Sequence, residues 1–112
     1  MSCAGDLLAR TRPTFTTRYN LTVPIARRFV ISGRVQGVGF RYFARESALV
    51  EGLSGSAANL PDGRVDIRVE GERQSVDRFE RKIRRGPPPA RVEHVDVFEE
   101  VPSARAGTFD VR

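Results

Sequence analysis

The chain has 112 residues, the length of one ordinary domain that can bury a core without disulfides. Hydrophobic residues make up 39% and charged residues 29% of it. No apolar run approaches the roughly 18 residues of a membrane span, so we expect a soluble, cytoplasmic protein with no membrane contact. The net charge is +5, but the signs alternate along residues 27–112, which favours small anions over nucleic acid as partners.

The first 26 residues are rich in Thr, Arg and Pro and lack a hydrophobic period. They are predicted to be a disordered extension, and residues 27–112 to be the folded domain. Two other interpretations stay open. An Arg-rich, acid-poor segment is typical of a transit peptide, and Asn20-Leu21-Thr22 matches a glycosylation sequon.

The first strand is predicted at residues 27–32, where Phe29 and Ile31 are expected to face the core. The side chains expected on the opposite side are those of Arg28, Val30 and Ser32. Gly33 ends this strand, and a glycine-rich loop follows. Residues 41–50 are then predicted as a helix that ends at Gly52, and its buried side is formed by Phe40, Ala44 and Ala48.

A hairpin is predicted next, with strands at residues 55–60 and 64–70 joined by the turn Pro61-Asp62-Gly63. In its second strand the apolar residues alternate strictly with charged ones, so Val65, Ile67 and Val69 are expected to face the core.

Ser75 can cap a second helix, which Gly86 and Pro87 end. Its buried side is expected to carry Val76, Phe79 and Ile83. Residues 92–99 read as a strand, and Phe109 with Val111 indicates a short last one. The order βαββαβ plus a short terminal strand predicts an α+β fold, the ferredoxin-like split βαβ sandwich. In that fold two helices lie on one face of an antiparallel-dominated sheet.

The candidate anion site is the loop between the first strand and the first helix, which consists of Gln36, Gly37, Val38, Gly39, Phe40 and Arg41. Main-chain N–H groups at a helix N-terminus carry partial positive charge, and a glycine-bearing turn lets several converge on one anion. The Arg41 guanidinium adds a fork of donors that matches two phosphate oxygens. The loop has neither the Gly-Lys-Ser/Thr of a P-loop nor G-x-G-x-x-G, which disfavours nucleotide binding. From composition alone, a structural turn beside a solvated arginine is the simpler interpretation.

Two segments resemble the acylphosphatase family. Residues 31–41, ISGRVQGVGFR, are similar to the first signature of that family position by position. Residues 59–65, NLPDGRV, match its second landmark, an asparagine just before a hairpin turn, at the right distance from the loop. The resemblance covers roughly residues 27–112. It implies a hydrolase acting on acid anhydrides, which splits the carboxyl-phosphate bond of a small-molecule acyl phosphate to give a carboxylate and inorganic phosphate.

The resemblance also implies the roles of the site residues. Arg41 and the loop amides bind the phosphoryl group, and inorganic phosphate or sulfate as well, while Asn59 orients the attacking water. A carboxylate leaving group has a conjugate-acid pKa near ~4 and departs without a general acid. We therefore expect no metal and no cofactor. A monomer is the default expectation. His94 is interpreted as an exposed strand residue rather than a ligand or a base.

Three positions depart from the family pattern. Glu51 stands where the first helix normally continues its apolar face, Ser56 where an aromatic residue is usual, and Ala57 where a larger aliphatic residue is usual. Loose packing there would disturb Asn59. The alternative function is therefore a catalytically impaired acylphosphatase-like domain that serves as a binding or regulatory module.

A binding module of the RRM type shares the element order, but it requires aromatic residues on the exposed face of its third strand. That face here carries Arg64, Asp66, Arg68 and Glu70. The run Pro87-Pro88-Pro89 fits a polyproline ligand for an SH3-type partner, but a rigid connection from helix to strand explains it as well.

Overall fold

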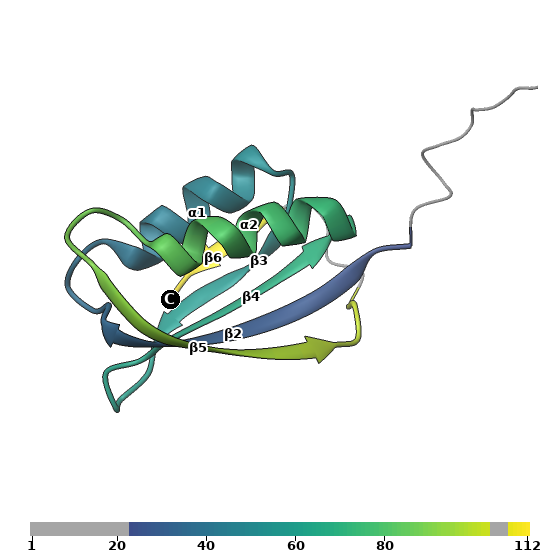
Figure 1. Cartoon of the computed structure of the whole chain (residues 1–112). Coiled ribbons are helices and arrows are strands. Elements are labelled where there is room, and N and C mark those ends of the chain that lie inside the picture. Colours follow the sequence, from purple (N-terminus) through teal and green to yellow (C-terminus); the bar gives the residue numbers. More distant parts are fainter. Residues whose placement is uncertain (1–22, 104–107) are drawn as a thin grey trace, which may run out of the picture.

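Helices and strands form two layers in the computed structural model, which describes residues 23–103 and 108–112 (Figure 1). In chain order the described elements are β2 (Ile25–Arg34), α1 (Phe40–Val50), β3 (Ser54–Asn59), β4 (Val65–Gly71), α2 (Arg73–Arg85), β5 (Arg91–Glu100) and β6 (Phe109–Val111). Most of the extension predicted at residues 1–26 lies outside the described residues, whereas Ile25 and Ala26 belong to β2.

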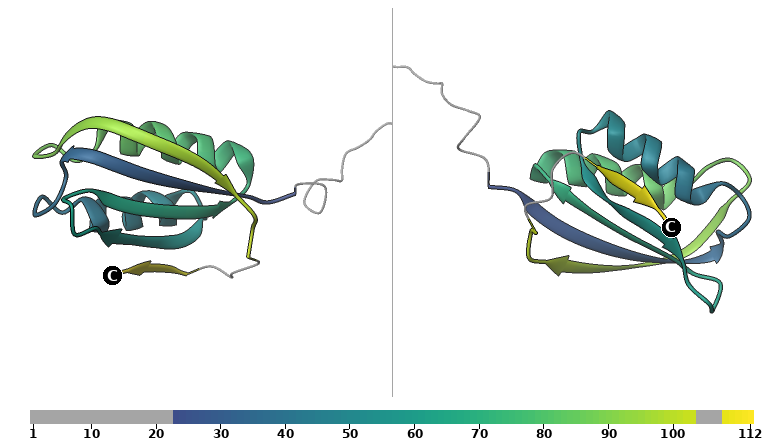
Figure 2. Two further views of the ribbon diagram at one scale, coloured as in Figure 1. Left: turned by 90° about the horizontal axis from the view of Figure 1, so that it is seen from below. Right: turned by 180° about the vertical axis from the view of Figure 1, so that it is seen from behind.

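The described strands form one sheet in the order β5-β2-β4-β3-β6. All neighbours in it are antiparallel except β3 and β6, which are parallel. Both helices cover the same face of the sheet (Figure 1). The view from below shows the other face (Figure 2). This arrangement confirms the predicted ferredoxin-like sandwich.

The core lies between the sheet and the helices. The side chains expected there from β2, α1, β4 and α2 are all buried, and the rings of Phe29 and Phe79 pack with their centroids 6.0 Å apart. The largest fully buried side chains are Phe29, Phe40, Phe79, Ile31, Leu53, Ile67, Ile83, Val35, Val65, Val69 and Val76. Burial of each such residue stabilises the fold by about 1.5–3 kcal/mol.

Three local predictions need correction. β2 does not end at Gly33, because Gly33 and Arg34 pair with β5 beyond a register shift. The alternation along β2 predicts Val30 on the side opposite the core, yet it is only 3% exposed. Its strand lies inside the sheet, where Val30 has Asp66 on one side and Asp96 on the other. Ser75 does not cap α2, because the helix begins at Arg73 and the first helical hydrogen bond runs from Val76 N to Glu72 O at 3.0 Å.

Glu51 and Ala57, which differ from the family pattern, are both held by specific contacts. Arg78 Nε donates to Glu51 Oε1 at 2.8 Å, and Lys82 Nζ lies 3.5 Å from Glu51 Oε2, so an ion pair joins the end of α1 to α2. Ala57 is fully buried within the core cluster and is paired with Val111 of β6. Phe98 of β5 is 46% exposed, and the Arg28 guanidinium lies over its ring, 5.6 Å from the centroid.

Candidate active site

The loop between β2 and α1 has the backbone of an anion cradle. Gly37 and Gly39 have φ of 73° and 78°, in the left-handed region that glycine adopts without strain. Gly39 is the N-cap of α1 and has no side chain that could cap the helix. The first helical bond runs from Phe43 N to Gly39 O at 2.9 Å, so the N–H groups of residues 40–42 have no partner inside the helix. A Cβ placed on either glycine meets no atom within 4 Å, which leaves the space beside the loop open.

Arg41 lies in the first turn of α1, where one main-chain contact holds its side chain. Arg41 Nη1 donates to the main-chain oxygen of Arg112. The N–H of Arg112 in turn donates to Ala57 O of β3 at 2.8 Å. The guanidinium has five N–H donors, so this contact leaves others for a ligand.

Asn59 is the last residue of β3 and is exposed. Alternation along the strand puts it on the same face as buried Ala57, which is the face covered by α1. The ends of β2 and β3, the start of α1 and the C-terminal residue gather at one end of the molecule (Figure 1). Asn59 and Arg41 are therefore at the same end of the sandwich.

A side-chain contact ties the loop to the hairpin that follows Asn59. Gln36 Nε2 donates to Leu60 O at 2.7 Å and to Arg64 O at 2.9 Å. The turn itself is closed by Asp62, whose carboxylate accepts from Arg64 N at 3.1 Å and from Arg64 Nε at 2.8 Å. The backbone hydrogen bond from Arg64, followed by the side-chain bond and the charge of that arginine, lowers the pKa of Asp62 and keeps it an acceptor.

The predicted loop residues contribute in different ways. The side chain of Phe40 is buried in the core, and Val38 packs against the core cluster, so both residues can offer only main-chain groups to an anion. The sequence indicates Gln36 for its main-chain amide, but it indicates neither the contact of the Gln36 side chain with the hairpin nor Arg112 as the partner of Arg41. A main-chain acceptor far along the chain carries no residue signature, so nothing in the sequence signals either contact.

The other candidate groups lie elsewhere. His94 is exposed, and its Nε2 lies 2.8 Å from Asp96 Oδ1. Within residues 23–103 and 108–112, no group of three or more His, Cys, Asp or Glu side chains could hold a metal ion. The same residues contain no helix that is long and apolar enough to cross a membrane.

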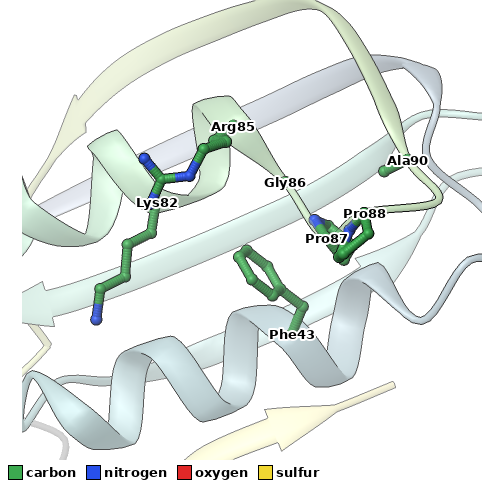
Figure 3. Close-up of a pocket in the computed structure, with 7 residues that line it drawn as sticks. All are labelled: Phe43, Lys82, Arg85, Gly86, Pro87, Pro88 and Ala90. Carbon is green, nitrogen blue, oxygen red and sulfur yellow. The ribbon is translucent and has the colours of Figure 1, made fainter.

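A cleft of about 460 Å³ lies between α1 and the C-terminal end of α2. The ring of Phe43 rises from α1 toward the connection that follows α2, with Lys82 on one side and Pro87 on the other (Figure 3). The lining residues are Phe43, Lys82, Arg85, Gly86, Pro87, Pro88 and Ala90. None of them is a predicted site residue, so this cleft is distinct from the cradle.

Comparison with known proteins gives one consistent result. The sequence model of the family described as Acylphosphatase matches residues 27–111. The acylphosphatase of Chromohalobacter salexigens is 48% identical over 81 residues, which are 72% of this chain and 89% of that protein. The acylphosphatase of Rubrobacter xylanophilus is 53% identical over 85 residues, 76% of this chain and 77% of that protein.

A solved structure gives the same answer for the fold. The acylphosphatase of Coxiella burnetii superposes with a TM-score of 0.77 at 33% identity, and the match covers 87% of this chain and all of that one. Sequence model, relatives and solved structure all match the part of the chain that holds the loop, Arg41 and Asn59. The chain belongs to the acylphosphatase family.

Proposed function

We propose that this protein hydrolyses the carboxyl-phosphate bond of small-molecule acyl phosphates to a carboxylate and inorganic phosphate. The observation that carries the proposal is the convergence of the glycine loop, Arg41 and Asn59 at one end of the sandwich, in a chain whose relatives are acylphosphatases. Fold alone would not be enough, because one fold serves many activities.

The phosphoryl group binds in the cradle of residues 36–41. The N–H groups at the start of α1 point at its equatorial oxygens, and the positive end of the helix dipole favours its charge. Arg41 adds charge-assisted hydrogen bonds from the donors that the Arg112 contact leaves free. Phosphoryl transfer needs mainly in-line positioning and neutralised oxygen charge, and this donor set supplies both.

Asn59 positions the attacking water. Its carbonyl oxygen accepts a hydrogen bond from the water, which directs a lone pair of the water oxygen at phosphorus. The new P–O bond forms as the bond to the acyl oxygen breaks, and the carboxylate leaves with the electron pair. Its conjugate acid has a pKa near ~4, so no general acid is needed. The proton lost by the water passes to a phosphate oxygen.

Two observations favour the hydrolase over the catalytically impaired module. Glu51 is bound to α2 by Arg78 and Lys82, and Ala57 is fully buried beside β6. The segment between α1 and Asn59 is therefore packed at both positions. We further propose that the enzyme acts as a cytoplasmic monomer and that inorganic phosphate occupies the same loop as the substrate.

Hydrolysis of benzoyl phosphate in the presence of a chelator tests the proposal. Arg41→Ala is expected to lower kcat/KM by about 10²–10³-fold and to weaken inhibition by inorganic phosphate, because it removes a donor to the transferred group. Asn59→Ala is expected to lower kcat by about 100-fold while inhibition by phosphate stays within about twofold of the original.

The matched control is Arg45→Ala, which removes an exposed arginine one turn further along α1 and should leave the rate unchanged. Equal activity in all four proteins would refute the site, and loss of activity on chelation would refute a mechanism that uses only the groups of the chain.

A further inference from the structure

The side chain of Gln36 binds the hairpin between β3 and β4. Its Nε2 lies 2.7 Å from Leu60 O and 2.9 Å from Arg64 O, which are 24 and 28 residues further along the chain. Both partners are carbonyl oxygens, so only the NH₂ end of the amide can face them. Both N–H groups are thus used on the hairpin.

These two carbonyls lie at the base of the hairpin, where one of the two main-chain hydrogen bonds between Leu60 and Arg64 is not formed. Leu60 N donates to Arg64 O at 2.8 Å, but the return bond is not made, because Arg64 N donates to Asp62 Oδ1 at 3.1 Å. The Leu60 carbonyl accepts instead from Gly63 N at 3.1 Å and from Gln36. The Gln36 amide therefore completes the base of the hairpin from outside.

Leu60 directly follows Asn59, so the contact acts on the neighbour of the residue that positions water. Asn59 ends its strand and is exposed, and its placement therefore follows mainly from the main chain on either side. Before Asn59 the main chain is held by the strand pairing with β4. After Asn59 it is held by the turn and by Gln36.

We propose that Gln36 is a positioning residue that fixes the distance between the phosphate cradle and Asn59. Its main-chain N–H belongs to the cradle and its side chain binds the hairpin, so one residue links the phosphoryl group to the water. The inference rests on the proposed function of Asn59. A displacement of about 1 Å between water and phosphorus is enough to slow an in-line attack by one or two orders of magnitude.

The test replaces Gln36 by Glu, which has the same shape but puts an oxygen against the two carbonyls, and separately by Leu, which removes the donors. The matched controls are Gln74→Glu and Gln74→Leu on the exposed surface of α2. With benzoyl phosphate as substrate, both Gln36 variants are expected to lose about tenfold in kcat, whereas the inhibition constant of inorganic phosphate changes by less than about twofold. Thermal unfolding shows that each variant is folded under the assay conditions.

The same substitutions are then made in Asn59→Ala. If Gln36 acts through Asn59, Gln36→Leu changes kcat by less than about twofold in that background, because the water is no longer positioned. An equal loss in both backgrounds would overturn the proposal, as would a weakening of phosphate inhibition that matches the loss of kcat. Unchanged kcat in Asn59→Ala itself refutes the proposed function of Asn59, a result separate from any failure of Gln36.

Discussion

Gly55 is a residue of β3 at which no side chain fits. Its φ is +156°, and a Cβ there would lie 1.8 Å from Arg68 O of β4. Gly52, just after α1, also has a positive φ, of +72°, but a Cβ there would meet no atom within 4 Å. Substitutions at these two glycines therefore distinguish the stability lost through a strained backbone from the stability lost through a steric clash.

Gly55→Ala is therefore expected to destabilise the protein by about 3 kcal/mol. Residue 55 would be strained at its positive φ, and β3 or β4 would also have to move to make room for the methyl group. Gly52→Ala is the control, with an expected cost of about 1 kcal/mol from the left-handed backbone alone. Urea unfolding followed by circular dichroism measures both. Equal losses would show that β3 has room for the methyl group.

At the scale of elements, one buried arginine joins β2 to two neighbours. Arg27 is 7% exposed and donates to Asp77 and Glu80 of α2 at 2.9 and 3.1 Å and to Glu99 of β5 at 2.8 Å. Glu80 also accepts from Arg84 Nε at 3.0 Å, so the loss of Arg27 leaves Asp77 and Glu99 without this cation.

Arg27→Ala is expected to cost about 2–3 kcal/mol of unfolding free energy, because it removes both the packing of a buried side chain and the shared partner of Asp77 and Glu99. Arg45→Ala, which breaks an exposed pair with the adjacent Glu46, should change stability by less than about 0.5 kcal/mol. Urea unfolding at pH 7 distinguishes the two. A loss from Arg27→Ala as small as that from Arg45→Ala would mean that the cluster contributes no net stability.

The ion pair of Glu51 with Arg78 and Lys82, which joins α1 to α2, makes the stability of the protein depend on pH. The hydrogen bond from Arg78, with the nearby charge of Lys82, lowers the pKa of Glu51 in the folded state despite its burial. Its contribution is therefore fully present above the unfolded pKa near ~4.3 and is lost as the pH falls through the lower, folded pKa.

Between about pH 6 and about pH 3 the original protein should thus lose more stability than Glu51→Gln, and the two curves should converge in acid. Glu46→Gln, at an exposed position of α1, is the control and should run parallel to the original. Urea unfolding across this range gives the curves. If the curve of Glu51→Gln runs parallel to that of the original protein, Glu51 does not contribute to the loss of stability in acid.

At the scale of the whole molecule, the site residues lie beside both central strands and the short strand β6. Among the described strands, β2 and β4 each have neighbours on both sides, whereas β6 is a three-residue strand at the edge that pairs with β3. Arg112, which holds Arg41, directly follows this edge strand.

Native-state hydrogen exchange should reflect this difference. The amides of Phe29 and Ile67 are expected to exchange only through global unfolding, and the amide of Arg112 at least about 100-fold faster through local opening of β6. NMR exchange rates at residue resolution measure this. Equal protection of Arg112 and Ile67 would show that β6 opens only together with the central strands.

The sequence by itself determined the elements, most of their buried side chains and the glycine loop, because periodicity and turn chemistry act between near neighbours in the chain. It did not indicate the burial of Val30, which lies in a strand with neighbours on both sides. It also predicted the fold class, since the element order leaves few arrangements. Only the tertiary structure decided that Gln36 reaches the hairpin, that Arg41 meets the main chain of Arg112 and that Arg27 gathers three carboxylates. The physical reason is that a main-chain acceptor has no residue identity and that these partners, up to 72 residues apart, meet only along the folded path of the chain.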